Sequence, residues 1–235
     1  MRESRRREFL DAARQVVTTD GQAALTMLRL AKAVGTSEGN VYNYFSSKTV
    51  LLAELEIEAL ETIVHAFTEG QANIQGQLTS AKATPRLTAL TRAMGSTRFW
   101  IAAESTLPNE IELSRRIYSQ PETIESEQVE RVLGAALNFL TLGAQTLEGA
   151  VERRVLQPGN NVERSLLALA SISGALITGR LDQWDAGLFD GRHMATDLIG
   201  YLFAGWGAPA KLLTEAAAFL DGMTDEQLAP NPATT

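Results

Sequence analysis

The amino-acid sequence predicts an all-α protein, and three of its features support this fold class. Apolar residues recur every three or four positions through most of the chain, which is the period of an amphipathic helix. No segment shows the strict alternation of apolar and polar residues that is typical of a half-buried strand. Proline and glycine separate the periodic segments, as they do where helices begin and end.

The first 50 residues predict three helices around a tight turn. The apolar residues that share one face of the first helix, residues 5–19, are Phe9, Ala12, Ala13, Val16 and Val17. A second helix begins at Thr26 and ends at Gly35, because glycine adopts positive φ without steric cost. Ser37 is expected to offer its hydroxyl to the N–H groups that open a short third helix, about Glu38–Phe45. The last two helices and their turn make a helix-turn-helix.

This helix-turn-helix resembles the DNA-binding head of the TetR family of bacterial transcriptional regulators, over about residues 5–55. The residues that carry the resemblance are Phe9, Leu10, Ala12, Ala13, Gly21, Leu25, Thr26, Leu30, Ala31, Gly35, Tyr42, Phe45, Ser47 and Lys48. The resemblance implies that a double-stranded DNA operator is a partner of the head. It also implies that the rest of the chain is an all-helical domain that forms a homodimer and holds a pocket for a small-molecule effector.

The resemblance further implies which side chains contact DNA. Those that would face the major groove are Thr36, Ser37, Glu38, Gly39, Asn40 and Asn43, and those that would hold phosphates are Thr26, Tyr42, Tyr44 and Lys48. Asparagine amides fit the edge of adenine, and a glutamate accepts a hydrogen bond from cytosine N4. Tyr42 and Phe45 have an alternative role as packing residues, which we favour for Phe45.

Charge is distributed unevenly along the chain. The net charge is −7, but residues 1–50 carry +3 and the remainder −10. A basic head on an acidic body attracts DNA to one end of the molecule. Glu38 stands where a cation or a neutral residue would ease the approach to DNA, and the resemblance places Leu28 where some family members carry a basic residue. Arg29, Lys32 or the N-terminal arm is therefore expected to supply the missing charge. The cluster Arg2, Arg5, Arg6 and Arg7 is either an arm along DNA or a solvated surface.

Proline and glycine divide the rest of the chain into further helices. Their expected ranges are 47–70, 85–103, 108–121, 121–157, 162–184, 191–205 and 211–220. The predicted domains are a helix-turn-helix DNA-binding domain at 1–48, a helical effector-binding and dimerisation domain at 49–222, and a C-terminal tail at 223–235. The tail is expected to be mobile from Ala229.

The body contains candidates for a dimer interface and for an effector pocket. Residues 166–179 mix large aliphatic side chains with small ones, and with residues 197–206 they resemble the family's paired dimer helices, unless they fill the monomer core. The pocket candidates are Phe99, Trp100, Tyr118, Phe139 and Trp184, with Arg98, Glu104 and Gln145 as polar groups. Aromatic residues on helices are also typical of plain core. Because few charges accompany them, the expected effector is largely apolar.

Composition and motifs exclude several other classes. The chain has no cysteine, no stretch of signal-peptide type and no uninterrupted apolar run of about 18 residues, so we expect a cytoplasmic protein without a membrane span. Residues 35–39 spell the G-x-S-x-G pattern of a hydrolase, but that pattern must follow a strand and needs a histidine base. Since Ser37 follows a helix, and His65 and His193 are isolated, we expect no catalytic residue, no metal and no cofactor.

The sequence therefore predicts a one-component transcriptional repressor. It would bind a palindromic operator as a homodimer and be released by a small-molecule effector. Two alternatives stay open. One is a dimeric ligand-binding protein whose head no longer reads DNA, and the other is a hydrolase built on Ser37.

Overall fold

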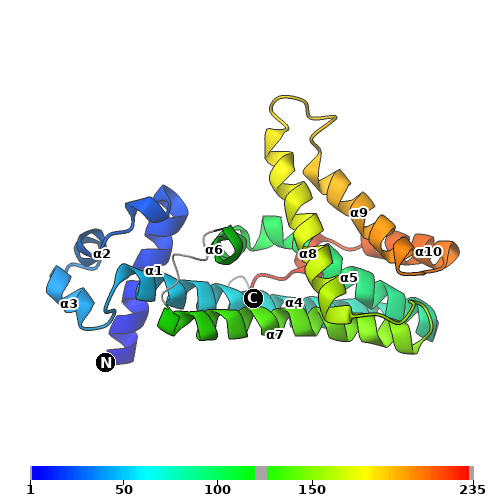
Figure 1. The fold of residues 1–235 in the computed structure, drawn as a ribbon, viewed down its shortest axis with the longest axis horizontal. Coiled ribbons are helices and arrows are strands. Elements are labelled where there is room, and N and C mark those ends of the chain that lie inside the picture. Colours follow the sequence, from blue (N-terminus) through cyan, green and yellow to red (C-terminus); the bar gives the residue numbers. More distant parts are fainter. Residues whose placement is uncertain (1, 120–125, 233–235) are drawn as a thin grey trace. The chain divides into compact units, whose positions relative to one another are not determined.

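A computed structural model confirms the all-helical fold class (Figure 1). It describes the backbone of residues 2–119 and 126–232 and the side chains of residues 2–115 and 128–232, and no strand occurs in these ranges. The helices are α1 Arg2–Asp20, α2 Met27–Ala33, α3 Glu38–Tyr42, α4 Lys48–Ser80, α5 Pro85–Thr106, α6 Pro108–Ser119, α7 Ser126–Glu152, α8 Asn161–Thr178, α9 Gly191–Gly205, α10 Ala210–Asp221 and α11 Asp225–Leu228. Short 3-10 helices cover Gln22–Ala24 and Gly179–Leu181.

The chain divides into two compact units. Unit 1 comprises Met1–Glu61 and Asn109–Ala136, and unit 2 comprises Thr62–Pro108 and Leu137–Thr235. Two long helices, α4 and α7, begin in unit 1 and end in unit 2. The domain boundaries expected from the sequence follow the helix-turn-helix pattern instead and stay a prediction.

Unit 1 is built around one apolar core. Phe9 of α1 and Phe45 after α3 are almost fully buried, with ring centroids 6.4 Å apart in an edge-to-face arrangement. Leu30 of α2, Val41 of α3 and Leu51 of α4 join the same cluster. The core role that we favoured for Phe45 is therefore confirmed. This packing matters because α2 and α3 are too short to be stable alone.

Local hydrogen bonds set the ends of the short helices. The Thr26 hydroxyl accepts a hydrogen bond from the Arg29 N–H at 3.0 Å, which confirms its role as the cap of α2. Gly35 has a φ of +67°, and the N–H of Thr36 reaches back to the Ala31 carbonyl at 2.9 Å. This closure is the glycine-terminated helix end that the sequence predicts.

Two helix ends differ most from the prediction. α4 continues ten residues beyond Gly70, because Ile74 and Leu78 are both buried and extend its apolar face by one further turn each. α8 stops at Thr178 rather than Trp184, and a 3-10 turn follows it. There, Gly179 and Gly191 approach so closely that a Cβ on Gly179 would lie 2.7 Å from the Gly191 Cα.

In unit 2, α5 is the central helix and packs against α8, α9, α10 and α11. The C-terminal segment is part of this packing. Leu228, Ala229 and Pro230 are buried, and the Asn231 side chain donates a hydrogen bond to the Thr106 carbonyl at 2.8 Å. The expectation of a mobile tail from Ala229 is therefore wrong for residues 229–231, because their apolar and polar groups both find partners on α5.

One described helix, Asn161–Leu181, is long and apolar enough to span a membrane by length and composition. We expected no membrane span because serine and glycine interrupt the apolar run in this segment. These residues nevertheless lower the mean hydropathy of the helix only a little. A single helix of this kind is weak evidence for a membrane, because core and interface helices have the same composition.

Candidate nucleic-acid interface

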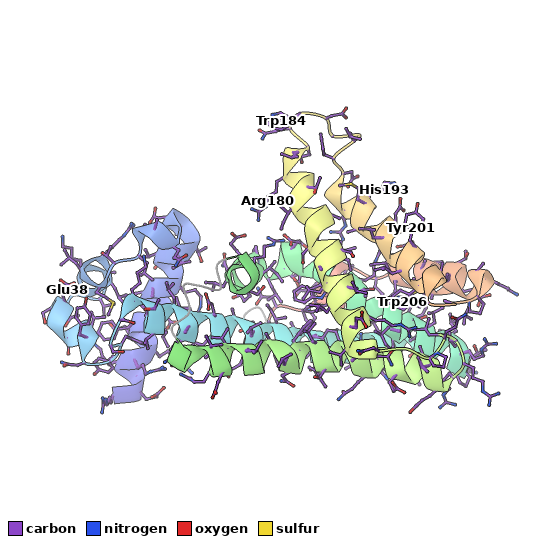
Figure 2. All side chains as sticks on the ribbon, viewed as in Figure 1. Glu38, Arg180, Trp184, His193, Tyr201 and Trp206 are labelled. Carbon is purple, nitrogen blue, oxygen red and sulfur yellow. The ribbon has the colours of Figure 1, made fainter. Side chains whose placement is uncertain are left out.

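The third helix and the residues beside it leave the positions predicted to face a DNA groove exposed or half-buried. Its inner side is held by Val41, which is fully buried, so the remaining positions of this five-residue helix turn outward. Ser37, Gly39 and Asn43 are exposed. Thr36, Glu38 and Asn40 are half-buried, and Glu38 lies at the start of α3 (Figure 2).

Asn40 is oriented by a hydrogen bond within this surface. Its side-chain Nδ2 donates to the Thr36 hydroxyl at 2.9 Å. An amide has two N–H groups and an acceptor oxygen, so one N–H and the carbonyl oxygen remain for another partner. That pair of groups is what bidentate recognition of adenine requires.

Ser37 does not cap α3 through its side chain, so that detail of the prediction is wrong. The residue has the extended backbone of a cap, at φ −84° and ψ 151°, but its hydroxyl makes no cap bond. The N–H of Asn40 bonds to the Ser37 carbonyl at 3.0 Å instead. This leaves the exposed hydroxyl available to a ligand outside the helix.

The four predicted phosphate contacts fall into two groups. Tyr42 is 49% exposed, and Thr26 is exposed while its hydroxyl caps α2. Tyr44 packs on Phe9 with ring centroids 5.2 Å apart, and the Lys48 ammonium donates to the Gln22 carbonyl at 2.9 Å. Tyr42 is therefore the aromatic side chain of the set whose ring is most open to solvent.

Many cations of unit 1 are neutralised by nearby carboxylates. Within α1, Arg5 pairs with Glu8 at 2.6 Å, and Arg14 pairs with Asp11 at 2.9 Å. Arg29 pairs with Asp20. The i,i+3 pairs were visible in the sequence as spacings on one helix. Among the described side chains of this unit, Arg2, Arg7 and Lys32 take part in no ion pair, and all three are exposed.

The N-terminal arginines, Arg2, Arg5, Arg6 and Arg7, all belong to α1. Arg6 pairs with Glu54 of α4 at 2.9 Å, and Arg131 of α7 donates to the same carboxylate at 2.7 Å. Burial by itself would raise the pKa of Glu54, but the hydrogen bonds from Arg131 and Arg6 outweigh it and hold that pKa below its ordinary value. Residue spacing gave no indication of this three-helix contact.

The predicted effector-pocket residues do not all come together. Phe99, Trp100 and Phe139 pack against one another, with centroids 4.8 Å apart for Trp100 and Phe139, and all three are buried. The cavity beside them measures only about 20 Å³, room for about one water molecule. Trp184 lies on the connection between α8 and α9 and is 74% exposed (Figure 2). The Tyr118 side chain lies outside the described residues.

A larger open cleft lies elsewhere in unit 2, with a volume of about 950 Å³. The second half of α4, the first turns of α5 and the last turns of α7 line it, and Gln145 is the one earlier candidate that it includes. Arg98 is used internally, because it bonds to the Thr196 hydroxyl at 3.0 Å and to Asp221 at 2.5 Å. Sequence reasoning missed the cleft because the wall that α7 contributes begins at Leu142, 50 residues after Arg92, the last lining residue of α5.

Comparison with known proteins shows which family and which solved structures this chain is similar to. The family model for bacterial regulatory proteins of the tetR family matches residues 9–55. No curated protein sequence matches the chain. SmeT, the repressor of the Stenotrophomonas maltophilia multidrug efflux pump SmeDEF, is 17% identical with a TM-score of 0.55, over 88% of this chain and 92% of that one.

Two further solved structures are similar over most of their length. The fatty acid degradation regulator FadR from Bacillus halodurans is 18% identical with a TM-score of 0.53, over 87% of this chain and 97% of that one. RolR, solved in complex with resorcinol, is 15% identical with a TM-score of 0.53, over 95% of this chain and 96% of that one. At these identities the similarity establishes a shared fold.

Proposed function

The chain is a TetR-family transcriptional regulator, and from that premise we propose that it is a homodimeric repressor of a palindromic operator, released by a small-molecule effector. The observation that carries the proposal is the exposed outer surface of α3, at the second helix of a helix-turn-helix. We further propose that it acts in the cytoplasm, where its DNA partner is located.

The proposed DNA contacts divide between bases and phosphates. Glu38, Asn40 and Asn43 would read base edges. Gly39 has no side chain and open space beside it, since a Cβ built there would meet no protein atom within 4 Å, so its backbone could approach a base closely. The other groove contacts in the proposal are Thr36 and Ser37, and the phosphate contacts are Thr26, Tyr42, Tyr44 and Lys48. Lys48 would exchange the Gln22 carbonyl for a phosphate on binding.

The proposed dimer forms through α8 and α9. Leu166, Leu167 and Ile177 on α8 are each 47–49% exposed, and Tyr201 on α9 is 71% exposed (Figure 2). Residues 165–179 of this helix contain no charged side chain. A two-fold axis would place this surface against its own copy, which buries apolar area without leaving a charge unpaired.

The proposed effector has a largely apolar body and acts by shifting a population of dimer conformations. To convert a 99:1 mixture of binding-competent and released forms into 1:99, it must bind the released form more tightly by about 5.5 kcal/mol. Helix α4 is the proposed connection, since it begins at Lys48 beside the DNA-binding residues and its second half lines the open cleft.

Selection from a random duplex pool tests the DNA-binding part. Purified protein is incubated with the pool at moderate salt, because phosphate contacts weaken steeply as salt rises. Enrichment of one palindrome supports a dimeric DNA reader. Failure to enrich any sequence, at low salt and with protein refolded free of small molecules, favours the alternative of a dimeric ligand-binding protein that does not read DNA.

The hydrolase alternative is wrong, since TetR-family regulators are non-enzymatic DNA-binding proteins. Ser37 follows α2, a helix, rather than the strand that a nucleophile elbow requires. Each histidine pairs with a carboxylate four residues on, His65 with Glu69 at 3.4 Å and His193 with Asp197 at 3.5 Å.

A further inference from the structure

The open cleft of unit 2 has an apolar floor. Phe67 and Leu78 of α4 are 3% and 1% exposed where they line it, and Leu142 of α7 lies among the same lining residues. The Phe67 ring also contacts Phe99 and Phe139, with centroids 5.4 Å and 5.2 Å away. A molecule in the cleft would therefore touch the aromatic cluster of this unit through Phe67. The volume of about 950 Å³ is in the range of small-molecule sites.

The lining of the cleft carries a positive charge that contrasts with the rest of the chain. Lys82, Arg92 and Arg153 line it together with one carboxylate, Glu152. The local excess is two positive charges, in a chain whose net charge is −7. Among the described residues, no ion pair involves any of these four side chains. The cleft therefore offers cations that the protein itself does not neutralise.

Arg92 is held in place by a neighbour that leaves its outer edge open. Gln71, which is 7% exposed, accepts a hydrogen bond from Arg92 Nε at 3.4 Å and donates one to the Arg92 carbonyl at 3.2 Å. Neither bond uses the two terminal nitrogens of the guanidinium, for which the structure describes no protein partner. Two parallel N–H groups of this kind match a carboxylate.

Lys82 occupies an unfavourable backbone position for a lysine. Its φ is +51°, and it closes α4 through a hydrogen bond from the Ala83 N–H to the Leu78 carbonyl at 3.0 Å. Glycine is the usual residue at such a helix end, because a Cβ destabilises the left-handed conformation. The other described non-glycine residue with positive φ is Arg154, at +54°, at the end of α7. Arg154 does not line the cleft.

From these observations we propose that the cleft binds the anionic group of a small amphipathic acid, with its apolar part on Phe67, Leu78 and Leu142. Arg92 is the anchor of the anion, and Lys82 and Arg153 add charge at the rim. The inference rests on the proposed function only for its regulatory consequence, which is that this acid is the effector. Binding of the acid itself can be tested without DNA.

The test uses three probes with the same eight-carbon chain: octanoate, octan-1-ol and octylammonium. Their binding to the full-length protein is measured by titration calorimetry at neutral pH. Octanoate is expected to bind most tightly and octylammonium least, because only the charge differs in sign. Equal binding of the three probes, or no binding of octanoate at millimolar concentration, would overturn the proposal.

Matched variants locate the site. Lys82→Gly removes a rim cation and also relieves the left-handed backbone, so loss of binding cannot be explained by a destabilised fold. Arg154→Gly makes the same two changes outside the lining. We expect Lys82→Gly to weaken octanoate binding about 3-fold and Arg92→Gln about 10-fold, with Arg154→Gly unchanged. Unchanged octanoate affinity in both Lys82→Gly and Arg92→Gln would refute the location.

Operator binding is measured separately, so that the two proposals can fail independently. If the wild-type protein binds its selected palindrome but octanoate binding shows no charge preference, the anion site is refuted and the repressor proposal is unaffected. If octanoate binds as expected but no duplex is ever enriched, the cleft proposal stands and the repressor proposal fails. Thermal unfolding of Arg92→Gln shows whether that variant remains folded.

Discussion

Tyr42 is predicted to contact a DNA phosphate, and its exposed side chain fits that role better than a role in core packing. Phe45, three residues later, is buried in the core of unit 1, whereas nearly half of Tyr42 is exposed. Helical spacing alone did not separate the two aromatic residues. The neighbouring contacts did, because Phe45 meets Phe9 and the Arg6 guanidinium lies 5.3 Å from its ring centroid.

Tyr42→Phe should lower operator affinity about 10-fold, because a hydroxyl that donates to a phosphate is worth about 1.5 kcal/mol. Fluorescence anisotropy with the selected duplex measures the change. Ser80→Ala, which removes an exposed hydroxyl at the end of α4 that no proposed contact uses, is the control and should bind like wild type. Equal affinity of wild type and Tyr42→Phe would remove Tyr42 from the interface.

Glu54 gives a prediction about pH. Because Arg131 and Arg6 hold its pKa below the ordinary value, the folded state favours the ionised form and gains stability at pH values above the ordinary pKa. That contribution disappears as the pH falls through the folded-state pKa. Glu54→Gln should therefore lower the free energy of unfolding by about 1–2 kcal/mol at neutral pH and by much less in acid.

Urea denaturation across the acid range checks this dependence. Glu69→Gln is the matched control, because Glu69 is an exposed carboxylate on the same helix and its partner is His65. Its effect should stay within about 0.5 kcal/mol. A loss of stability in Glu54→Gln that is the same at every pH would contradict the assignment of the effect to the charge.

The long helices illustrate how far local patterns determine an element. The start of α4 is local, since the Ser47 hydroxyl accepts a hydrogen bond from the Val50 N–H at 3.1 Å, and serine before a periodic run predicts such a cap. The end of α4 was not predicted, because residues 72–84, which are rich in glutamine, serine, threonine and alanine, show only weak helical periodicity. What extends the helix is burial of Ile74 and Leu78 by other helices.

Gly70 lies where α4 meets the C-terminal segment. A Cβ built on Gly70 would lie 2.0 Å from the Leu228 carbonyl oxygen, whereas one on Gly76 meets no atom within 4 Å. Gly70→Ala should therefore destabilise the protein by about 2 kcal/mol, since the clash is with backbone. Gly76→Ala, six residues later on the same helix, should stabilise it by up to about 1 kcal/mol through helix propensity.

Thermal unfolding of the two variants gives the comparison directly. The two variants should change the stability in opposite directions, which distinguishes close packing of α11 on α4 from a general effect of alanine on the helix. If Gly70→Ala were as stable as Gly76→Ala, the C-terminal segment would not pack on α4 in solution.

Assembly is the property of the whole molecule on which operator recognition depends, because one head reads only half of a palindrome. Leu166→Glu should weaken the dimer at least about tenfold, since two unpaired charges would be buried at a two-fold interface. Analytical ultracentrifugation measures this, and operator affinity should fall with it. Leu133→Glu is the control, because Leu133 on α7 is similarly exposed, at 50% against 47% for Leu166.

A Leu166→Glu protein that remains dimeric would show that α8 is not the dimer surface. The exposed apolar side chains of α8 would then require another explanation. The same experiment separates two readings of this helix, as an interface between copies or as a core helix of one chain, which the sequence left open.

The sequence by itself determined the helix-turn-helix and the family, because caps, turns and apolar spacing act within about ten residues. Thr26, Gly35 and Ser47 perform the local roles that their residue types predict. Only the tertiary structure decided that Phe99, Trp100 and Phe139 close into core, and that Arg92 and Arg153 line one cleft. These arrangements bring together residues about 40 to 60 positions apart, and they depend on how whole helices pack rather than on any local pattern.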